Sequence, residues 1–348
     1  METKQRRRPD FSKLRGVKPQ TVNLSGAVVE RTFLEPGRAL PLVYRPATAD
    51  VDVVDWSTKN RRAIDQDCVR HGAVLFRGFG VDAVDLFDRL ASALCNELFN
   101  ENGEHPRESV NRNVYTPVFF PPDQKLLWHN ENSFNQRWPR KIIFCCVRPA
   151  DVGGETPLVD SRELFRRLPD AIRADFQSRQ VMYRRNYGTG LGRDWPDVFQ
   201  TENPAEVEAR CKADGIEMAW KDGGQRLSTW AVRPAIVRHP DTGEMSWFNQ
   251  AQHWHVSCVD DDTRKSMEAV FAAEDMPRSC HFGDGSPIPD QVMGEILDHY
   301  RQLEVSFPWQ RGDVLVVDNI SVAHARNPFA GERKLLVALG DMMSFAQV

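Results

Sequence analysis

Two short segments far apart in the chain carry residues that could bind one metal ion together. The first is His129-Asn130-Glu131, in which one residue separates a histidine from a glutamate. Side chains alternate along extended backbone, so His129 and Glu131 would point to the same face as neighbouring ligands. The tripeptide alone is weak evidence, because a chain with nine histidines and many glutamates can contain such a match by chance.

A second segment strengthens this interpretation. His324 follows Asp313–Asp318, an apolar run typical of a buried strand. Two imidazoles and one carboxylate on one face of a metal form the facial triad of non-haem Fe(II) oxygenases, which leaves positions open for a co-substrate and dioxygen. A zinc site with two histidines and one glutamate is the rival, but its common helical signature, H-E-x-x-H, is absent from the sequence. The pattern therefore favours Fe(II) over Zn(II).

Two more residues suit a dicarboxylate co-substrate. Arg333 begins the last strand-like run, and a guanidinium can hold a carboxylate with two parallel hydrogen bonds. Thr156, within Gly153–Pro157, could donate a hydroxyl hydrogen bond to the same carboxylate. Lys334 is the local alternative to Arg333, although strand alternation would send it to the opposite face.

The hydrophobic pattern outlines the elements that must position these residues. Strands are predicted at Ala73–Phe79, Lys141–Val147, Asp313–Asp318 and Arg333–Leu339, and a hairpin at Trp230–Val237 and Glu244–Phe248 around His239–Gly243. Helices are predicted from Ala83 to Leu98, from about Ser161, from Asp262 to Glu274 and from Ile288 to Gln302. Many short strands without regular strand–helix alternation indicate an α+β fold, mainly β, built on an antiparallel sandwich or barrel.

Composition limits the class of protein. The chain has 348 residues, 41% of them hydrophobic and 27% charged, with a net charge of −4. This composition argues against disorder and against a nucleic-acid partner, and no run approaches the roughly 18 apolar residues of a membrane helix. We expect one soluble, cytoplasmic domain over residues 1–348, with 1–20 as a flexible basic N-terminus and a small molecule as its partner. Seven cysteines without a C-x-x-C motif are expected to be reduced core thiols.

At its candidate ligands the sequence resembles the Fe(II)/2-oxoglutarate-dependent oxygenases of the taurine dioxygenase and clavaminate synthase-like superfamily, over most of the chain. It is most similar to the syringomycin-type amino acid hydroxylases of nonribosomal peptide pathways. The motifs that carry this resemblance are Gly72–Phe79, His129–Phe134, Gly153–Pro157, Asp284–Ile288, Phe307–Trp309 and Asp318-Asn319. The resemblance implies a double-stranded β-helix (jelly-roll) core with helical insertions. It also implies iron bound by His129, Glu131 and His324, and 2-oxoglutarate bound by Thr156 and Arg333.

The implied reaction uses Fe(II), 2-oxoglutarate and O2 to hydroxylate an unactivated C–H bond and releases succinate and CO2. The expected substrate is an amino acid or related metabolite of secondary metabolism, either free or tethered to a carrier protein. Because halogenases of the superfamily replace the ligand carboxylate with a small residue, the retained Glu131 disfavours chlorination. Desaturation, ring closure or stereoinversion by the same cofactors stays open, and a non-catalytic binding protein is the less favoured alternative. Val337 stands where some relatives have a second arginine for the substrate's acid group.

Substrate contacts are predicted from strand alternation alone. Ser133 would share the face of Glu131 if the strand continued, and Arg326 would share the face of His324, so either could reach a polar group of the substrate. Segments Arg112–Pro122 and Arg184–Gly190 are predicted to be either lids over the site or ordinary surface loops.

One pair of histidines has the spacing of metal ligands but is interpreted differently. His253-Trp254-His255 repeats the H-x-H pattern, yet nothing else in that segment indicates a metal site. Both histidines are expected to be core or hydrogen-bonded residues.

Overall fold

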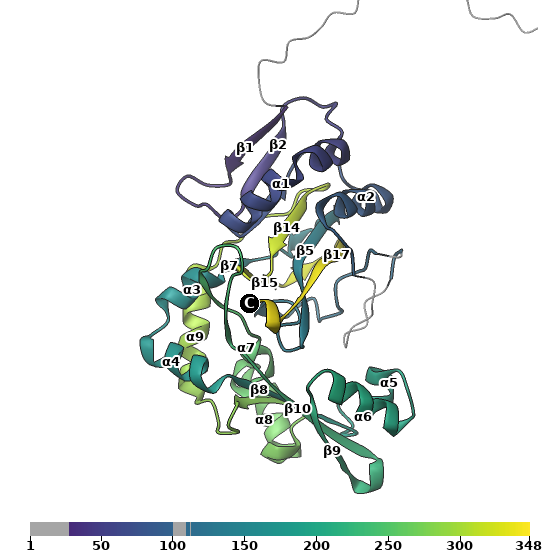
Figure 1. Ribbon diagram of the computed structural model, residues 1–348, viewed down its shortest axis with the longest axis vertical. Helices are drawn as coiled ribbons and strands as arrows, with labels where there is room; N and C mark the ends of the chain where they lie inside the picture. Colours follow the sequence, from purple (N-terminus) through teal and green to yellow (C-terminus); the bar gives the residue numbers. More distant parts are fainter. Residues whose placement is uncertain (1–27, 100–108, 112) are drawn as a thin grey trace, which may run out of the picture.

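The computed structural model describes residues 28–99, 109–111 and 113–348, so the predicted flexible segment 1–20 lies outside the described residues. The largest sheet has six strands, arranged around β14 and β5 (Figure 1). In spatial order they are β1 (Val29–Phe33), β2 (Leu42–Pro46), β3 (Ala73–Phe76), β14 (Val314–Asp318), β5 (Arg137–Arg148) and β17 (Lys334–Ser344). Among the described residues, β2 and β3 form the one parallel pair of strands, and the other paired strands are antiparallel.

Two helices cover one face of the large sheet. These are α1 (Val53–His71) and α2 (Val84–Leu94), which lie beside β14 and β5 in Figure 1. Along β14, Val314 and Val316 pack with these helices. The alternate residues, Leu315 and Val317, pack on the other face. Every side chain of β14 is therefore buried, which explains its continuous apolar sequence.

A small sheet packs on that second face. It consists of β4 (Leu126–His129), β15 (Val322–Arg326) and β7 (Leu158–Asp160), with β15 in the centre. Val322 and Leu158 pack against the large sheet, whereas Ala323 and Val159 pack outward. The outer layer against which they pack includes α3 (Ser161–Arg167), α4 (Asp170–Arg179) and α9 (Asp290–Leu303). The metal-ligand candidates on β4 and β15 thus lie in the sheet between the large sheet and this outer layer.

The remaining elements lie outside the two central sheets. A four-stranded sheet consists of β13 (Arg278–Phe282), β8 (Val181–Tyr187), β10 (Arg226–Arg233) and β9 (Glu217–Lys221). Two short pairs are β11 (Ile236–Arg238) with β12 (Met245–Trp247), and β16 (Phe329–Ala330) with β6 (Val152–Gly153). The other α-helices are α5 (Trp195–Phe199), α6 (Pro204–Ala213), α7 (Ala251–Trp254) and α8 (Asp261–Val270). Short 3-10 turns occur at Asp222–Gly224, Val256–Cys258, Ala273–Asp275 and Phe345–Gln347.

Most of the elements expected from the sequence form, with shifted ends. The predicted helix near Ser161 is α3, and the side chain of Asp160 accepts hydrogen bonds from the backbone N–H groups of Arg162 and Glu163. This is the N-cap arrangement that the sequence indicated. The other three predicted helices correspond to α2, α8 and α9.

Two expectations about β structure are wrong in part. The first arm of the predicted hairpin splits at Pro234, so β10 ends at Arg233 and only β11 pairs with β12. Proline has no backbone N–H and cannot continue a ladder of strand hydrogen bonds. The segment beginning at Arg184 is not a loop up to Tyr187, because it belongs to β8, which pairs with β10 on one side and β13 on the other.

The cysteine prediction is confirmed, and no long apolar helix is present in the described part of the chain. All seven cysteines are free, and six of them are buried. None of the helices in the described ranges has the length and apolar character needed to cross a membrane.

Candidate active site

The two histidines of the predicted triad face each other on neighbouring strands. β15 and β4 are antiparallel and pair His324 directly with His129. The ring centroids of the two histidines lie 4.3 Å apart. The ring of His324 also lies 5.2 Å from that of Phe144 on β5, which places His324 between the small and the large sheet. Strand pairing therefore brings together two residues that are distant in sequence.

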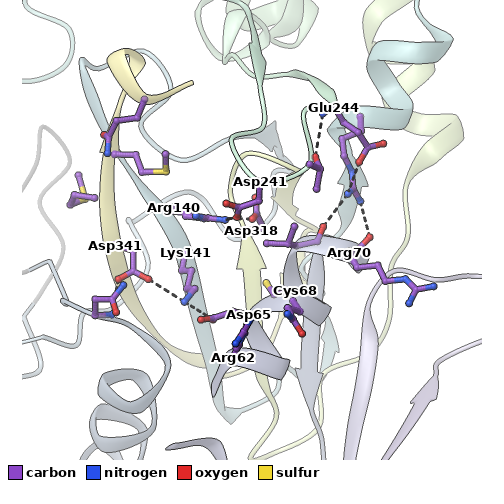
Figure 2. A pocket seen from close by; sticks show the side chains of 18 of the residues that line it. Arg62, Asp65, Cys68, Arg70, Arg140, Lys141, Asp241, Glu244, Asp318 and Asp341 are labelled. Atoms are coloured by element: carbon purple, nitrogen blue, oxygen red, sulfur yellow. Dashed lines mark hydrogen bonds and ion pairs between the residues drawn. The ribbon is translucent and has the colours of Figure 1, made fainter. Parts of the chain in front are cut away.

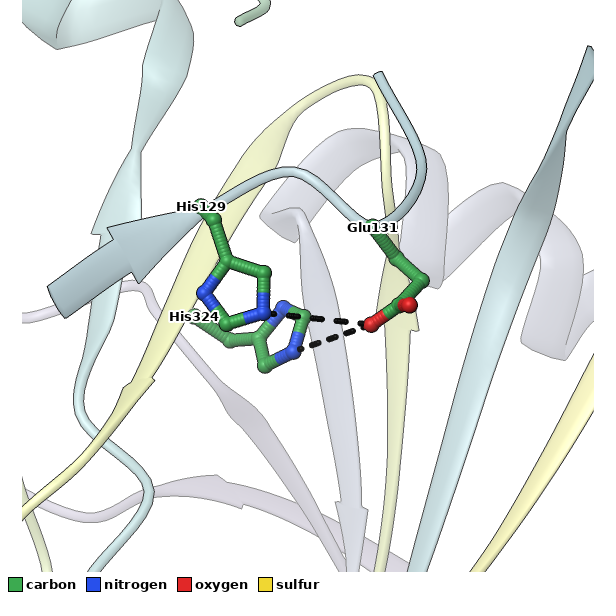
Figure 3. Close-up of side chains that lie close together, drawn as sticks. All are labelled: His129, Glu131 and His324. Atoms are coloured by element: carbon green, nitrogen blue, oxygen red, sulfur yellow. Dashed lines mark ion pairs between the residues drawn. The ribbon is translucent and has the colours of Figure 1, made fainter. Parts of the chain in front are cut away.

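Glu131 completes the cluster from a turn and not from a strand. β4 ends at His129, and the following residues form a turn in which Asn132 has φ of +57°. The carboxylate atom Oε2 of Glu131 lies 3.8 Å from Nε2 of His129 and 3.8 Å from Nε2 of His324 (Figure 3). The predicted convergence of these residues is present, although the extended backbone expected between His129 and Glu131 is not.

The spacing of the three donor atoms fits one metal ion. One ligand atom from each residue lies within 4.8 Å of the others. Two donors that each lie about 2.1 Å from a shared ion are separated by at most about 4.2 Å, so both 3.8 Å separations are compatible with shared coordination. Two imidazoles and one carboxylate are also the donor set of the facial triad.

A hydrogen bond fixes the tautomer of His129. Its Nδ1 lies 2.9 Å from the carbonyl oxygen of Leu127. Because a carbonyl can only accept, Nδ1 carries the proton and donates, which leaves the lone pair of Nε2 directed at the cluster. This is the arrangement that a metal-binding histidine needs.

The neighbouring histidines are core residues, as expected. Nε2 of His253 donates to the carbonyl oxygen of Leu127 at 2.8 Å, and its ring centroid lies 4.7 Å from that of His129. Burial, followed by the nearby His129, lowers the pKa of His253 to about 3. His255 hydrogen-bonds through Nε2 to the carbonyl oxygen of Ile288 at 2.9 Å. Both rings are occupied with backbone partners.

The cluster lies in a cavity of about 840 Å³. Residues 116–120 and Pro122 form part of its wall. They belong to the segment that was predicted to be either a lid or a surface loop. Phe144, Leu335 and Val337 add apolar surface from the large sheet, and Leu126 adds more from β4. The cavity thus combines a polar cluster at one place with a mainly apolar wall, which is typical of small-molecule sites.

Arg333 also lines this cavity, and its charge has no carboxylate partner among the described residues. Its Nε donates to the carbonyl oxygen of Gly154 at 2.9 Å. Burial, and next the charge of Arg326, lowers the pKa of Arg333 to about 10. A half-buried cation without an ion-pair partner is poorly compensated, so an anionic ligand would be favoured beside it.

The two glycines of Gly153–Pro157 permit this arrangement. Both have positive φ, +69° for Gly153 and +75° for Gly154. A Cβ on Gly154 would lie 3.0 Å from Cδ of Arg333, and one on Gly153 would lie 2.2 Å from the carbonyl oxygen of Pro328. A side chain at Gly154 would therefore crowd Arg333 itself, and one at Gly153 would collide with the backbone at Pro328.

Thr156 lines the cavity together with Arg333. Its side chain is buried, and Oγ1 accepts a hydrogen bond from Nε1 of Trp309 at 3.2 Å. An accepted bond leaves the hydroxyl hydrogen free to point to a ligand oxygen. Lys334 also borders the cavity, but it is exposed, in contrast to Arg333.

Of the two predicted substrate contacts, Ser133 lies outside the cavity lining, whereas Arg326 lines the cavity and its contact with a substrate stays a prediction. Ser133 does not line the cavity; it is fully buried, because the chain turns after His129 and strand alternation no longer applies. Arg326 does line the cavity, but its guanidinium donates to backbone carbonyl oxygens of residues 120, 121 and 122. Arg326 therefore holds the cavity wall through three backbone carbonyl groups.

A second cavity, of about 860 Å³, lies beyond the end of β14 (Figure 2). Its most buried cations are paired within the protein: Arg162 with Asp160 and Glu244, and Lys141 with Asp65 and Asp341. Asp318, at the end of β14, contributes to its lining. The candidate metal ligands do not line this cavity.

Sequence analysis missed the residues that shape the site without binding metal. Phe119 and Phe120 were predicted only as part of a lid or loop, Phe144 only as part of a strand, and Asn319, whose side chain contacts the backbone of Glu131, only as part of a family motif. Phe119 is 87% exposed, so the wall reaches the protein surface. The Pro- and aromatic-rich composition of residues 117–122 was the available signal for the wall.

Comparison with known proteins relates this chain to a family of dioxygenases. Residues 38–339 match the family model described as "Taurine catabolism dioxygenase TauD, TfdA family". The dapdiamide synthesis protein DdaC from Enterobacter agglomerans is 35% identical over 296 residues, which cover 85% of this chain and 89% of DdaC. A clavaminate synthase-like protein from Arabidopsis thaliana is 30% identical over 322 residues, covering 87% of this chain and 94% of that protein.

Solved structures share the fold at low sequence identity. PvcB from Pseudomonas aeruginosa superposes with a TM-score of 0.53 at 15% identity, covering 91% of this chain and 93% of PvcB. Another structure of PvcB is described as that of an Fe, alpha-ketoglutarate-dependent oxygenase from an isonitrile synthetic pathway. AAD-2, solved with Mn(II) and N-oxalylglycine, superposes with a TM-score of 0.53 at 12% identity, covering 90% of this chain and 97% of AAD-2.

Proposed function

This chain belongs to the taurine catabolism dioxygenase TauD/TfdA family, and from that premise we propose that it hydroxylates an unactivated C–H bond of an amino acid-like small metabolite. It is a dioxygenase that uses Fe(II), 2-oxoglutarate and O2. The observation that carries the proposal is the convergence of His129, Glu131 and His324 in a cavity that also contains the unpaired charge of Arg333.

We assign the iron to these three residues. Their donor atoms have the spacing and chemical type that a ferrous ion requires, and the tautomer of His129 directs a lone pair to the same place. Bound iron would activate O2, the oxidant, with 2-oxoglutarate as the co-substrate that is oxidised to succinate and CO2, which is chemistry that the protein's own side chains lack. The fold that delivers the ligands fits the jelly-roll core we infer, in which β14 and β5 of the large sheet face β15 of the small one.

We assign 2-oxoglutarate to Thr156 and Arg333. The keto acid end would occupy metal positions, and the distal carboxylate would lie against the guanidinium and the threonine hydroxyl. Support comes from the electrostatics of Arg333, because a carboxylate would neutralise a cation that has no ion-pair partner among the described residues. Lys334 would then be left at the exposed edge of the cavity.

The substrate would occupy the remaining, mainly apolar part of the cavity. Val337 is 2% exposed and brings no charge to the position where some relatives are expected to carry a second arginine. The wall formed by residues 116–122 would exclude water and hold one C–H bond toward the metal. The relationship to DdaC, named for dapdiamide synthesis, supports a role in secondary metabolite biosynthesis.

Two features stay predictions within this proposal. Presentation of the substrate on a carrier protein is one, and the cytosolic location expected from the sequence is the other. Desaturation, ring closure and stereoinversion use the same protein groups, so the mass of the product must separate them from hydroxylation.

The test is turnover of candidate substrates, free and loaded on a carrier protein, with Fe(II), ascorbate and 2-oxoglutarate. We expect succinate release and a product that has gained one oxygen atom, both abolished in His129→Ala. His299→Ala is the matched control, since His299 lies on α9 and does not line the cavity. A product that has lost two hydrogens would show that the reaction is desaturation or cyclisation and not hydroxylation. Tight binding of 2-oxoglutarate without any succinate release would favour a non-catalytic binding protein.

A further inference from the structure

The backbone of Glu131 needs support that no strand supplies. β4 ends two residues earlier, and the chain turns at Asn132. A glutamate also has one more rotatable side-chain bond than an aspartate, so its carboxylate sweeps a larger volume when the backbone shifts. Because a metal site tolerates only small displacements of its ligands, some group must fix the peptide of Glu131.

The side-chain amide of Asn319 contacts that peptide on both sides. Its Oδ1 accepts from the backbone N–H of Glu131 at 2.7 Å, and its Nδ2 donates to the carbonyl oxygen of Glu131 at 3.0 Å. The same Nδ2 donates to the carbonyl oxygen of Pro139 on β5 at 2.8 Å. Asn319 is fully buried. The amide thus makes the paired bonds that a neighbouring strand would make with its backbone.

Asn319 is itself held from several directions. Its backbone N–H donates to the carbonyl oxygen of Arg140 at 2.8 Å, and its carbonyl oxygen accepts from Nδ2 of Asn130 at 2.7 Å. Asn130 precedes Glu131, so each of the two segments holds the other's backbone with a side-chain amide. The carbonyl oxygen of Asn130 accepts in turn from Nε2 of Gln250 at 2.7 Å.

Asp318 shapes the turn that presents Asn319. Its Oδ1 accepts from the backbone N–H groups of Ile320 at 3.0 Å and Ser321 at 2.9 Å. Its Oδ2 accepts from Nε2 of His239 at 3.1 Å. Figure 2 shows Asp318 in the second cavity, beside Arg140 and Asp241. The turn is therefore anchored on the side opposite Glu131.

We propose that Asn319 is a positioning residue for the metal site: its amide sets the direction of the Glu131 carboxylate and so determines metal affinity. This inference rests on the proposed function, because it takes Glu131 as a metal ligand. Asn319 touches neither metal nor substrate and acts only through Glu131. Removing such an outer contact typically weakens metal binding or activity about 10- to 100-fold.

Asn319→Asp tests the donors specifically. The replacement has the same shape and keeps the acceptor for Glu131 N–H, but it loses both donors and turns a carboxylate toward two carbonyl oxygens. Asn186→Asp is the matched control. Asn186 is also buried, and its Nδ2 also donates to two carbonyl oxygens, those of Glu274 at 3.0 Å and Met276 at 2.7 Å, but it does not line the cavity of the candidate ligands.

The measurement is Mn(II) affinity of the metal-free protein, by equilibrium titration, alongside thermal unfolding. We expect Asn319→Asp to raise the Kd for Mn(II) about 10- to 100-fold, and Asn186→Asp to change it less than about threefold even when its melting temperature falls as far. Asn319→Ser, which is smaller and neutral, is measured in parallel, so that a folding defect of the aspartate variant does not remove the test.

The outcomes separate this inference from the proposed function. If the parent protein binds Mn(II) and loses it on His129→Ala, the metal site stands. Parent-like affinity in Asn319→Asp or Asn319→Ser would then overturn the positioning role alone. Failure of the parent to bind metal at all would overturn the proposed function. Equal loss of affinity in Asn319→Asp and Asn186→Asp would show a general folding effect and also refute the positioning role.

Discussion

Nη2 of Arg326 donates to the carbonyl oxygen of Pro121 at 2.7 Å and thereby ties the wall of the active-site cavity to the strand that carries His324. Two more carbonyl oxygens, of Phe120 and Pro122, accept from the same guanidinium. The rings of Phe120 and Phe329 lie on it, with centroids 5.4 and 5.1 Å from Cζ. This contact connects the cavity wall to a position two residues from His324, one of the proposed metal ligands.

Arg326→Lys should loosen the wall. A single ammonium group cannot reach three carbonyl oxygens in the geometry of a planar guanidinium, so at least one buried acceptor loses its partner. Since hydrogen bonds to charged groups contribute roughly 1.5–3 kcal/mol each, we expect the free energy of unfolding to fall by about 2 kcal/mol. Limited proteolysis within residues 116–122 should also become faster.

The control for this prediction is Arg148→Lys. Arg148 is an exposed arginine paired with the exposed Glu332, and its replacement should change neither measurement. Unchanged proteolysis and stability in Arg326→Lys would show that the three carbonyl contacts do not hold the wall.

Arg333→Gln should weaken 2-oxoglutarate binding and spare metal binding. Loss of a charge-assisted contact worth roughly 1.5–3 kcal/mol raises the KM for 2-oxoglutarate about 10- to 100-fold. Lys334→Gln, at the neighbouring exposed cation, should leave this KM nearly unchanged. If Lys334→Gln produced the larger increase, the assignment of the two residues would have to be exchanged.

Arg333→Gln should affect the stability of the ligand-free protein and of the ligand-bound protein differently. Because burial lowers the pKa of Arg333 to about 10, folding disfavours its charge at neutral pH. Removing that charge should not destabilise the ligand-free protein through electrostatics, whereas the rise in melting temperature on adding Mn(II) with 2-oxoglutarate should shrink. Calorimetry of both forms measures this, and an undiminished ligand-induced rise would contradict the role of Arg333.

Thr156→Val tests the threonine hydroxyl with nearly the same shape. A hydrogen bond from the hydroxyl to a carboxylate is charge-assisted and contributes roughly 1.5–3 kcal/mol, so the KM for 2-oxoglutarate should rise about 10-fold or more. Thr156→Ser retains the hydroxyl and should stay close to the parent. A serine variant as impaired as the valine variant would show that the methyl group matters and the hydroxyl does not.

Acid should destabilise the protein partly through His255. Burial lowers the pKa of His255, so the unfolded state takes up a proton below its ordinary pKa near 6.5 while the folded state does not. The stability that this histidine contributes is present above pH 6.5 and is lost as pH falls, by at most about 1.4 kcal/mol per pH unit. The slope of unfolding free energy between pH 7 and 5 should be shallower in His255→Gln, and equal slopes would refute this contribution.

The residues with a strong local signal were predictable from sequence. The continuous apolar run of β14 indicated a strand buried on both faces, and Asp160 followed by Glu163 indicated the start of α3. The convergence of His129, Glu131 and His324 was predictable because two histidines and one carboxylate together match a facial triad, although the His129–Glu131 spacing alone was weak evidence. In the strand and the helix start, the residues that determine the structure are close together in the sequence.

The residues that depend on distant partners were not predictable. Ser133 was misplaced because nothing in the sequence shows the turn at Asn132, where φ is +57°. The hydrogen bonds of Arg326 to the cavity wall were not predicted, because its acceptors are backbone carbonyls of a segment about 200 residues earlier, which have no side-chain signature. Asparagine is common in turns, so Asn319 did not stand out in the sequence. Its partner is the backbone of Glu131, which likewise has no side-chain signature.

The most direct measurement of the central claim is an anaerobic Fe(II) titration in the presence of 2-oxoglutarate, followed by the visible charge-transfer band of the complex. The account predicts a band that saturates at one iron per chain in the parent protein and is lost in His129→Ala, Glu131→Ala and His324→Ala. A full-strength band at one iron per chain in His324→Ala would contradict it, because one residue of the proposed triad would then be dispensable for binding the metal.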